Sequence, residues 1–135
     1  EVWECELIRY DALDGVNDFS SVSFATDYDG DLISDGDEYI TGTDPTDPES
    51  YLFTTISRVG TQEVVSSFGI RAEGPGYDGL KRHYRFEQAS ALDSNGWFSV
   101  PGFTNLIGNN TGMSFTNAVD TDPFRFYRTR TWLGR

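Results

Sequence analysis

Acidic side chains recur at fixed positions between residues 27 and 38, in the stretch DYDGDLISDGDE. Taking Asp27 as the first position, carboxylates stand at the third, fifth, ninth and twelfth positions, and Ile33 stands at the seventh. A calcium loop draws its ligands from these positions, with a backbone carbonyl at the seventh and a bidentate glutamate at the twelfth. The spacing predicts a Ca²⁺ site with the ligands Asp27, Asp29, Asp31, the carbonyl of Ile33, Asp35 and Glu38.

The residues after this loop, SDGDEYITG, have the composition of one short helix. Ser34 or Asp35 is a suitable N-cap, acidic residues follow in the first turn, and Gly42 is a suitable stop. We expect this helix to hold Glu38 in place, and we expect local order to come with the metal, because the empty loop gathers like charges.

Residues 27 to 48, DYDGDLISDGDEYITGTDPTDP, resemble a bacterial thrombospondin type 3 calcium repeat, D-x-D-G-D-G-x-x-D-x-x-E followed by G-T-D-P. The resemblance implies that aspartates after the helix can help to bind a second ion, which makes Asp44 and Asp47 candidates. The alternative is that both only stabilise Asp-Pro turns. Leu32 departs from the repeat, which has Gly at that position, and a positive φ there costs a non-glycine residue about 1 kcal/mol.

From Tyr51 onward the chain consists of short alternating segments separated by turn residues. Six of them have the length of a strand, namely residues 52–58, 62–70, 83–90, 97–103, 113–117 and 124–132. This spacing predicts a mainly β fold, a small β-sandwich preceded by an EF-hand-like calcium loop with one short helix. In HYRFE, Tyr84 and Phe86 are expected to face the core and His83 the solvent. The segment is similar to the fibronectin-like modules that follow such repeats in secreted bacterial proteins.

Residues 1–10, EVWECELIRY, alternate apolar and acidic side chains, as a half-buried strand does. The chain therefore divides into an N-terminal strand and connector (1–26), a calcium-binding repeat (27–50) and a sandwich (51–135). A lone strand leaves its backbone groups unpaired, so this one is expected to pair with its own sandwich or with a neighbouring copy. Pairing between copies would make Trp3, Cys5 and Leu7 an assembly contact and would propagate as an open filament.

The formal net charge is −12, and twelve acids with no base lie between Arg9 and Arg58. Without a basic stripe, nucleic acid is not an expected partner. No apolar run approaches the roughly 20 residues of a membrane span. The sequence also contains no phosphate loop, no Cys/His cluster and no nucleophile paired with a base, so we expect no enzyme activity.

These features favour a secreted, extracellular calcium-binding structural protein that assembles with other copies of itself, through its N-terminal strand, into a filament or a surface layer. The sequence starts at Glu1 without an initiator Met, so we expect it to be a mature form whose secretion signal has been removed. The alternative is a monomeric carbohydrate-binding or adhesion module, with Trp132 or Tyr77 as the platform for an extracellular glycan. Asn109, in the triplet NNT, is a candidate glycan acceptor.

Overall fold

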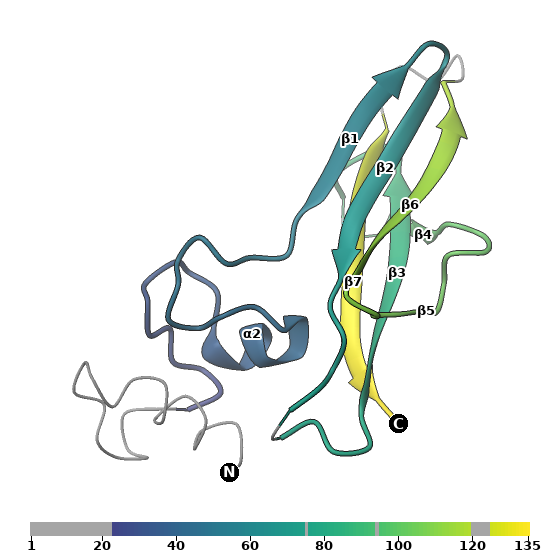
Figure 1. The fold of residues 1–135 in the computed structure, drawn as a ribbon. Helices are drawn as coiled ribbons and strands as arrows, with labels where there is room; N and C mark the ends of the chain where they lie inside the picture. The colour runs from purple at the N-terminus through teal and green to yellow at the C-terminus, as the bar shows by residue number, and fades with distance from the viewer. Residues whose placement is uncertain (1–22, 75, 94, 120–124) are drawn as a thin grey trace.

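The computed structural model describes residues 23–135 except 75, 94 and 120–124. The N-terminal strand expected over residues 1–10 lies outside the described residues. The described elements are one helix and seven strands (Figure 1): α2 (Asp35–Thr41), β1 (Thr54–Val59), β2 (Gln62–Gly69), β3 (Lys81–Ala89), β4 (Phe98–Ser99), β5 (Leu106–Ile107), β6 (Thr111–Ala118) and β7 (Phe126–Gly134). In this part of the chain, no helix has the length and apolar character to cross a bilayer.

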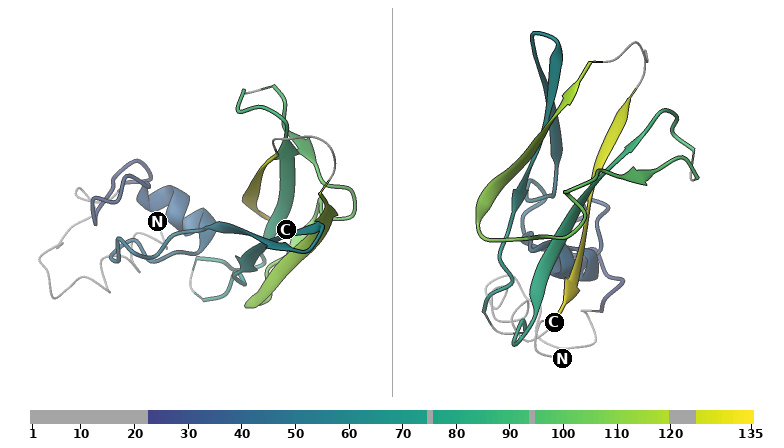
Figure 2. Two further views of the ribbon diagram at one scale, coloured as in Figure 1. Left: turned by 90° about the horizontal axis from the view of Figure 1, so that it is seen from above. Right: turned by 90° about the vertical axis from the view of Figure 1, so that its right-hand side faces the viewer.

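Two antiparallel sheets make up the β region, which confirms the predicted mainly β sandwich. One sheet, here called sheet A, has the order β1-β2-β6. In the other, sheet B, β3 pairs with β7 over its whole length and with the short strands β4 and β5 along its second edge. Figure 2 shows the two sheets as separate layers, with α2 beside one end of them.

The core lies between the two sheets and is rich in aromatic side chains. Val65, Phe86, Val100 and Phe115 are buried there, and Phe103, Leu106, Met113 and Tyr127 pack against them. The Phe86 and Phe115 rings, from different sheets, lie 5.1 Å apart between centroids. Tyr84 and Phe86 are fully buried, as the alternation in β3 predicts. Burial of these large rings supplies the main stabilisation of the sandwich.

Two segments differ from the expected strands. The strand expected over residues 97–103 is reduced to β4, because Pro101 and Gly102 form a turn closed by a 3.0 Å bond from the Phe103 N–H to the Val100 carbonyl. The two-residue strand β5 was not expected, since so short a segment has no readable alternation.

His83 is half-buried, not fully solvated, because its ring stacks on Trp132 across the strand pair.

Candidate metal centre

Three of the predicted ligands meet at the start of the loop. Carboxylate oxygens of Asp27, Asp29 and Asp31 lie within 4.8 Å of one another. Asp27 is exposed, whereas Asp29 and Asp31 are half-buried. Three carboxylates this close repel one another unless a cation or protons lie between them.

The same side chains also shape the loop through hydrogen bonds to its backbone. Asp27 accepts bonds from the N–H groups of Gly30 (2.8 Å) and Leu32 (3.0 Å). Asp31 accepts a bond of 2.7 Å from the N–H of Ile33, which is half-buried. Leu32 has the positive φ of 76° that its position in the loop predicts, and its side chain is 93% exposed. The loop therefore turns through hydrogen bonds of its own aspartates, and its turn strains Leu32.

Asp35 and Glu38 lie on the first turn of α2, and the structure gives them different surroundings. The Ser34 side chain caps the helix by accepting a bond from the N–H of Asp37. Asp35 is buried and closes the loop, because it accepts bonds from the Tyr28 N–H at 2.9 Å and from the Thr26 hydroxyl. Both carboxylate oxygens of Asp35 thus already accept hydrogen bonds.

Glu38 is the most enclosed carboxylate of the site, with 0% of its surface exposed. Its Oε1 accepts a bond of 3.3 Å from the Thr43 hydroxyl, but its Oε2 is buried without a hydrogen-bond partner. The Oδ2 atom of Asp29 is buried and unpartnered as well. Burial, together with the charges of Asp29 and Asp31, raises the pKa of Glu38 to about 7.

Burial is also the main cause that raises the pKa of Asp29. The charges of Asp31 and Asp27 raise this pKa further. Buried carboxylate oxygens without partners are costly, and a cation that accepts their lone pairs removes that cost. Oxygen-only donors from several carboxylates are the set that Ca²⁺ prefers. The residues present therefore fit a hard divalent cation. Asp27, Asp29 and Asp31 form the group, and Glu38, which is not part of it, interacts with the charges of Asp29 and Asp31 and has a buried oxygen without a partner.

Asp44 and Asp47, the candidates for a second ion, are exposed and lie in turns after the helix. Asp44 Oδ1 accepts bonds from the N–H (3.0 Å) and the hydroxyl (2.8 Å) of Thr46. Asp47 Oδ1 accepts a 3.0 Å bond from the N–H of Glu49. Within the described residues, the group of Asp27, Asp29 and Asp31 is the one that gathers three possible ligands, and neither of these aspartates joins it.

The loop and its helix are fastened to the sandwich by Arg82, a residue that the sequence analysis did not single out. Arg82 of β3 is 1% exposed, and its guanidinium donates to the carbonyl oxygens of Ile40 (2.7 Å), Tyr39 (3.2 Å) and Arg71 (2.9 Å). The first two carbonyls belong to the last turn of α2, where a cation is favourable. Arg82 directly precedes HYRFE and, by the alternation of the strand, lies on the same side as Tyr84 and Phe86. A cation at such a core-facing position is the sequence signal for a buried contact.

Two tyrosines complete the joint between α2 and the sandwich. The Tyr39 and Tyr77 rings stack with centroids 4.7 Å apart. The Tyr39 hydroxyl donates to the Gly76 carbonyl at 2.6 Å, and the Tyr77 hydroxyl donates to the Tyr39 carbonyl at 2.8 Å. The Arg82 guanidinium also lies 4.9 Å from the Tyr77 ring centroid. Tyr77 is thus engaged in this joint and does not offer an open ring.

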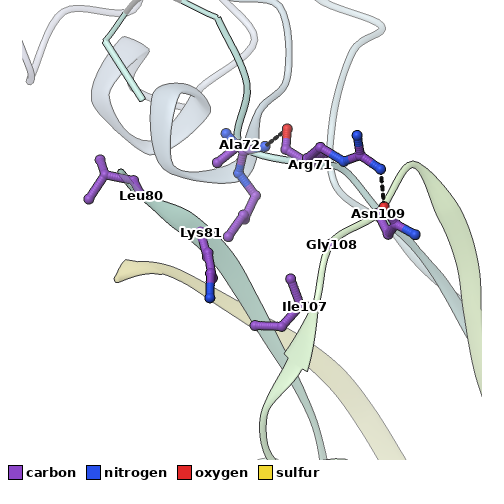
Figure 3. Close-up of a pocket in the computed structure, with 8 residues that line it drawn as sticks. Arg71, Ala72, Leu80, Lys81, Ile107, Gly108 and Asn109 are labelled. Atoms are coloured by element: carbon purple, nitrogen blue, oxygen red, sulfur yellow. Dashed lines mark hydrogen bonds between the residues drawn. The ribbon is translucent and has the colours of Figure 1, made fainter. Parts of the chain in front are cut away.

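The other predicted site residues lie apart from the carboxylates. Trp132, on β7, is 36% exposed and stacks on His83. Asn109 is exposed at the rim of a surface pocket of 530 Å³, and its side-chain oxygen accepts a bond from Arg71 (Figure 3). The expected assembly residues Trp3, Cys5 and Leu7 lie outside the described residues. No protein-family model, curated protein or solved structure matches this chain.

Proposed function

We propose that this chain is an extracellular calcium-binding structural protein in which one Ca²⁺ ion fixes the loop of residues 27–38 to the sandwich. The observation that carries this proposal is the pair of buried, unpartnered oxygens, Oε2 of Glu38 and Oδ2 of Asp29, beside the group of Asp27, Asp29 and Asp31. A bound cation would satisfy both oxygens and offset the repulsion among the carboxylates. Because α2 carries Glu38 at one end and docks on Arg82 at the other, the ion would stiffen the entry to the sandwich.

Titration calorimetry tests the metal site directly. Wild type is expected to take up Ca²⁺ saturably, with one ion per chain if Asp44 and Asp47 serve only their turns. Glu38→Gln and Asp29→Asn are nearly isosteric and remove one negative charge each, so both are expected to weaken binding strongly. Glu49→Gln is the matched control, since Glu49 is exposed and lies outside the loop. A flat trace for wild type, or equal binding by all four proteins, would contradict the proposal.

Assembly through residues 1–10 is the second part of the proposal, and the edge of sheet A supports it. Among the described strands β1 pairs with β2 alone, and every residue of β1 except Thr54 is exposed. Ile56 and Val59 are 52% and 64% exposed on this strand. An open edge of this kind accepts an added strand through its unpaired backbone groups.

Deletion of residues 1–10 is the corresponding experiment. The deleted chain is expected to remain folded and to bind Ca²⁺. At about 500 mM salt, where charge contacts between copies are screened, it is expected to sediment as a monomer while the full chain, with calcium, forms long assemblies. If the full chain sediments as a monomer at high concentration with calcium present, assembly is wrong and a monomeric binding module takes its place.

A further inference from the structure

The outward face of sheet B concentrates positive charge on a strongly acidic protein. Alternate residues of β3 and β7 share this face, since neighbouring side chains of a strand point to opposite sides. Four of the ten Lys and Arg residues of the chain stand on it, namely Lys81, Arg85, Arg128 and Arg130. We call these four residues the basic face. With 22 acids in the chain, such a grouping creates a local field opposite in sign to the rest of the molecule.

One buried carboxylate organises the basic face without neutralising it. Glu87 is 4% exposed, and its oxygens lie 2.9 Å from Arg85 Nε and 2.6 Å from Arg128 Nε. Arg130 Nη1 lies 4.0 Å from the same carboxylate and its side chain is 54% exposed. Because one negative charge faces three guanidinium groups, the cluster keeps an excess of positive charge at fixed positions.

Aromatic rings also contact two arginines of the basic face. The Arg128 guanidinium lies 4.2 Å from the ring centroid of Trp97, and that of Arg85 lies 5.9 Å from Trp132. The Trp132 ring also stacks on His83 with an interplanar angle of 12°. Two side chains of β3 already contact the Trp132 ring. The basic face therefore presents positive charge to a partner, rather than an open ring to a sugar.

The complementary charge lies on this same chain. Asp37, Asp44, Asp47 and Glu49 are exposed and lie outside the predicted ligand set of the loop. Their module docks on Arg82, whose side chain points to the face of β3 opposite to that of Lys81 and His83. The helix α2 therefore meets β3 through a side chain of the face opposite to the basic face, and Figure 1 shows α2 beside the lower end of the strands.

We propose that the basic face is a docking surface for the exposed acidic residues 37–49 of a second copy of this chain. Because donor and acceptor surfaces differ, the contact is heterologous and continues from copy to copy. The contact requires neither the bound ion nor residues 1–10, so it goes beyond the proposed function.

A charge-swap experiment on the full chain tests this contact. The basic-face variant carries Lys81→Glu and Arg130→Glu, and the acidic variant carries Asp47→Lys and Glu49→Lys. Each variant alone is expected to lose association about tenfold or more in sedimentation velocity at about 50 mM salt, because like charges then meet. A mixture of the two is expected to restore association. Arg71→Glu, an exposed charge reversal outside both the basic face and β1, is the control and should associate as wild type does.

Salt separates this contact from strand pairing through residues 1–10. At about 500 mM salt the charge contact should be lost, whereas a hydrogen-bonded strand pair should persist. Lys81→Gln with Arg130→Gln, which adds no acid beside Glu87, should also weaken association, and equal melting temperatures would confirm that the variants fold. Three outcomes would overturn the proposal: a wild-type monomer at low salt, failure of the mixture to associate, or a monomeric wild type that binds an acidic polysaccharide through these residues.

Discussion

Arg82 of β3 donates a hydrogen bond of 2.7 Å from its Nε atom to the carbonyl oxygen of Ile40, at the C-terminal end of α2. A cation from the sandwich thereby caps the helix whose first turn carries the predicted ligand Glu38. The same guanidinium lies so close to Gly42 that an added Cβ there would come within 2.4 Å of it. Through this one side chain the candidate metal centre and the β-sandwich share a contact, so changes at either are expected to be felt at the other.

Replacing Arg82 by Met is expected to lower the free energy of unfolding by about 2–4 kcal/mol, because it leaves buried carbonyls without donors. Chemical denaturation measures this change. Arg58→Met, at an exposed position on β1, is expected to have little effect. Equal stability of the two variants would show that the Arg82 contacts contribute nothing to folding.

Removal of calcium is expected to destabilise the whole chain and not only the loop. A ligand that binds only the native state adds RT ln(1 + [L]/Kd), about 2.7 kcal/mol at a hundredfold excess over Kd. A chelator should therefore lower the melting temperature of wild type by several degrees, while Glu38→Gln should melt at nearly the same temperature with and without calcium. If the wild-type melt is also unchanged by the chelator, the role of the metal is confined to the loop.

Stability without calcium is expected to depend on pH through Glu38. Its pKa rises from 4.5 to about 7 on folding, so the folded state binds more protons than the unfolded state between these values. The free energy of unfolding should thus fall as the pH rises from about 4.5 through about 7. Calcium affinity should instead increase as the pH rises, and it should weaken below about pH 7, because the proton competes with the ion for Glu38.

Denaturation of the calcium-free protein across this pH range checks the slope, and Glu38→Gln is the control because its side chain does not titrate. A slope of the same size in Glu38→Gln would assign the dependence to other groups.

Leu32 offers a stabilising substitution. Its φ of 76° is strained for leucine, and its 93% exposed side chain contributes little packing. Asn tolerates this conformation better, so Leu32→Asn is expected to raise the free energy of unfolding by about 0.5–1 kcal/mol. Leu32→Val, which is β-branched, should lower it. Thermal melts of the two variants in calcium test the order, and a more stable Val variant would contradict it.

The order of elements and the shape of the loop were largely readable in the sequence, because both depend on local chemistry. Alternation with a period of two placed Tyr84 and Phe86 in the core, and turn residues marked most strand ends. The predicted ligands lie within the twelve residues from Asp27 to Glu38, and Ser34 caps the helix through the N–H of Asp37, three residues on. Both features therefore depend on residues that are close in the sequence. Even the positive φ of Leu32 followed from its place in the loop.

Tertiary structure alone decided which long-range partners these residues meet. Arg82 shares its strand face with core aromatics, and only the docked helix shows that its charge is buried against backbone carbonyls. Glu87 draws in Arg85 from its own strand and Arg128 from another, although 41 residues separate Glu87 from Arg128. The burial that raises the pKa of Glu38 likewise arises from packing around it. Sequence fixes local periodicity and turn chemistry, whereas burial and charge pairing between distant segments depend on how the elements pack in three dimensions.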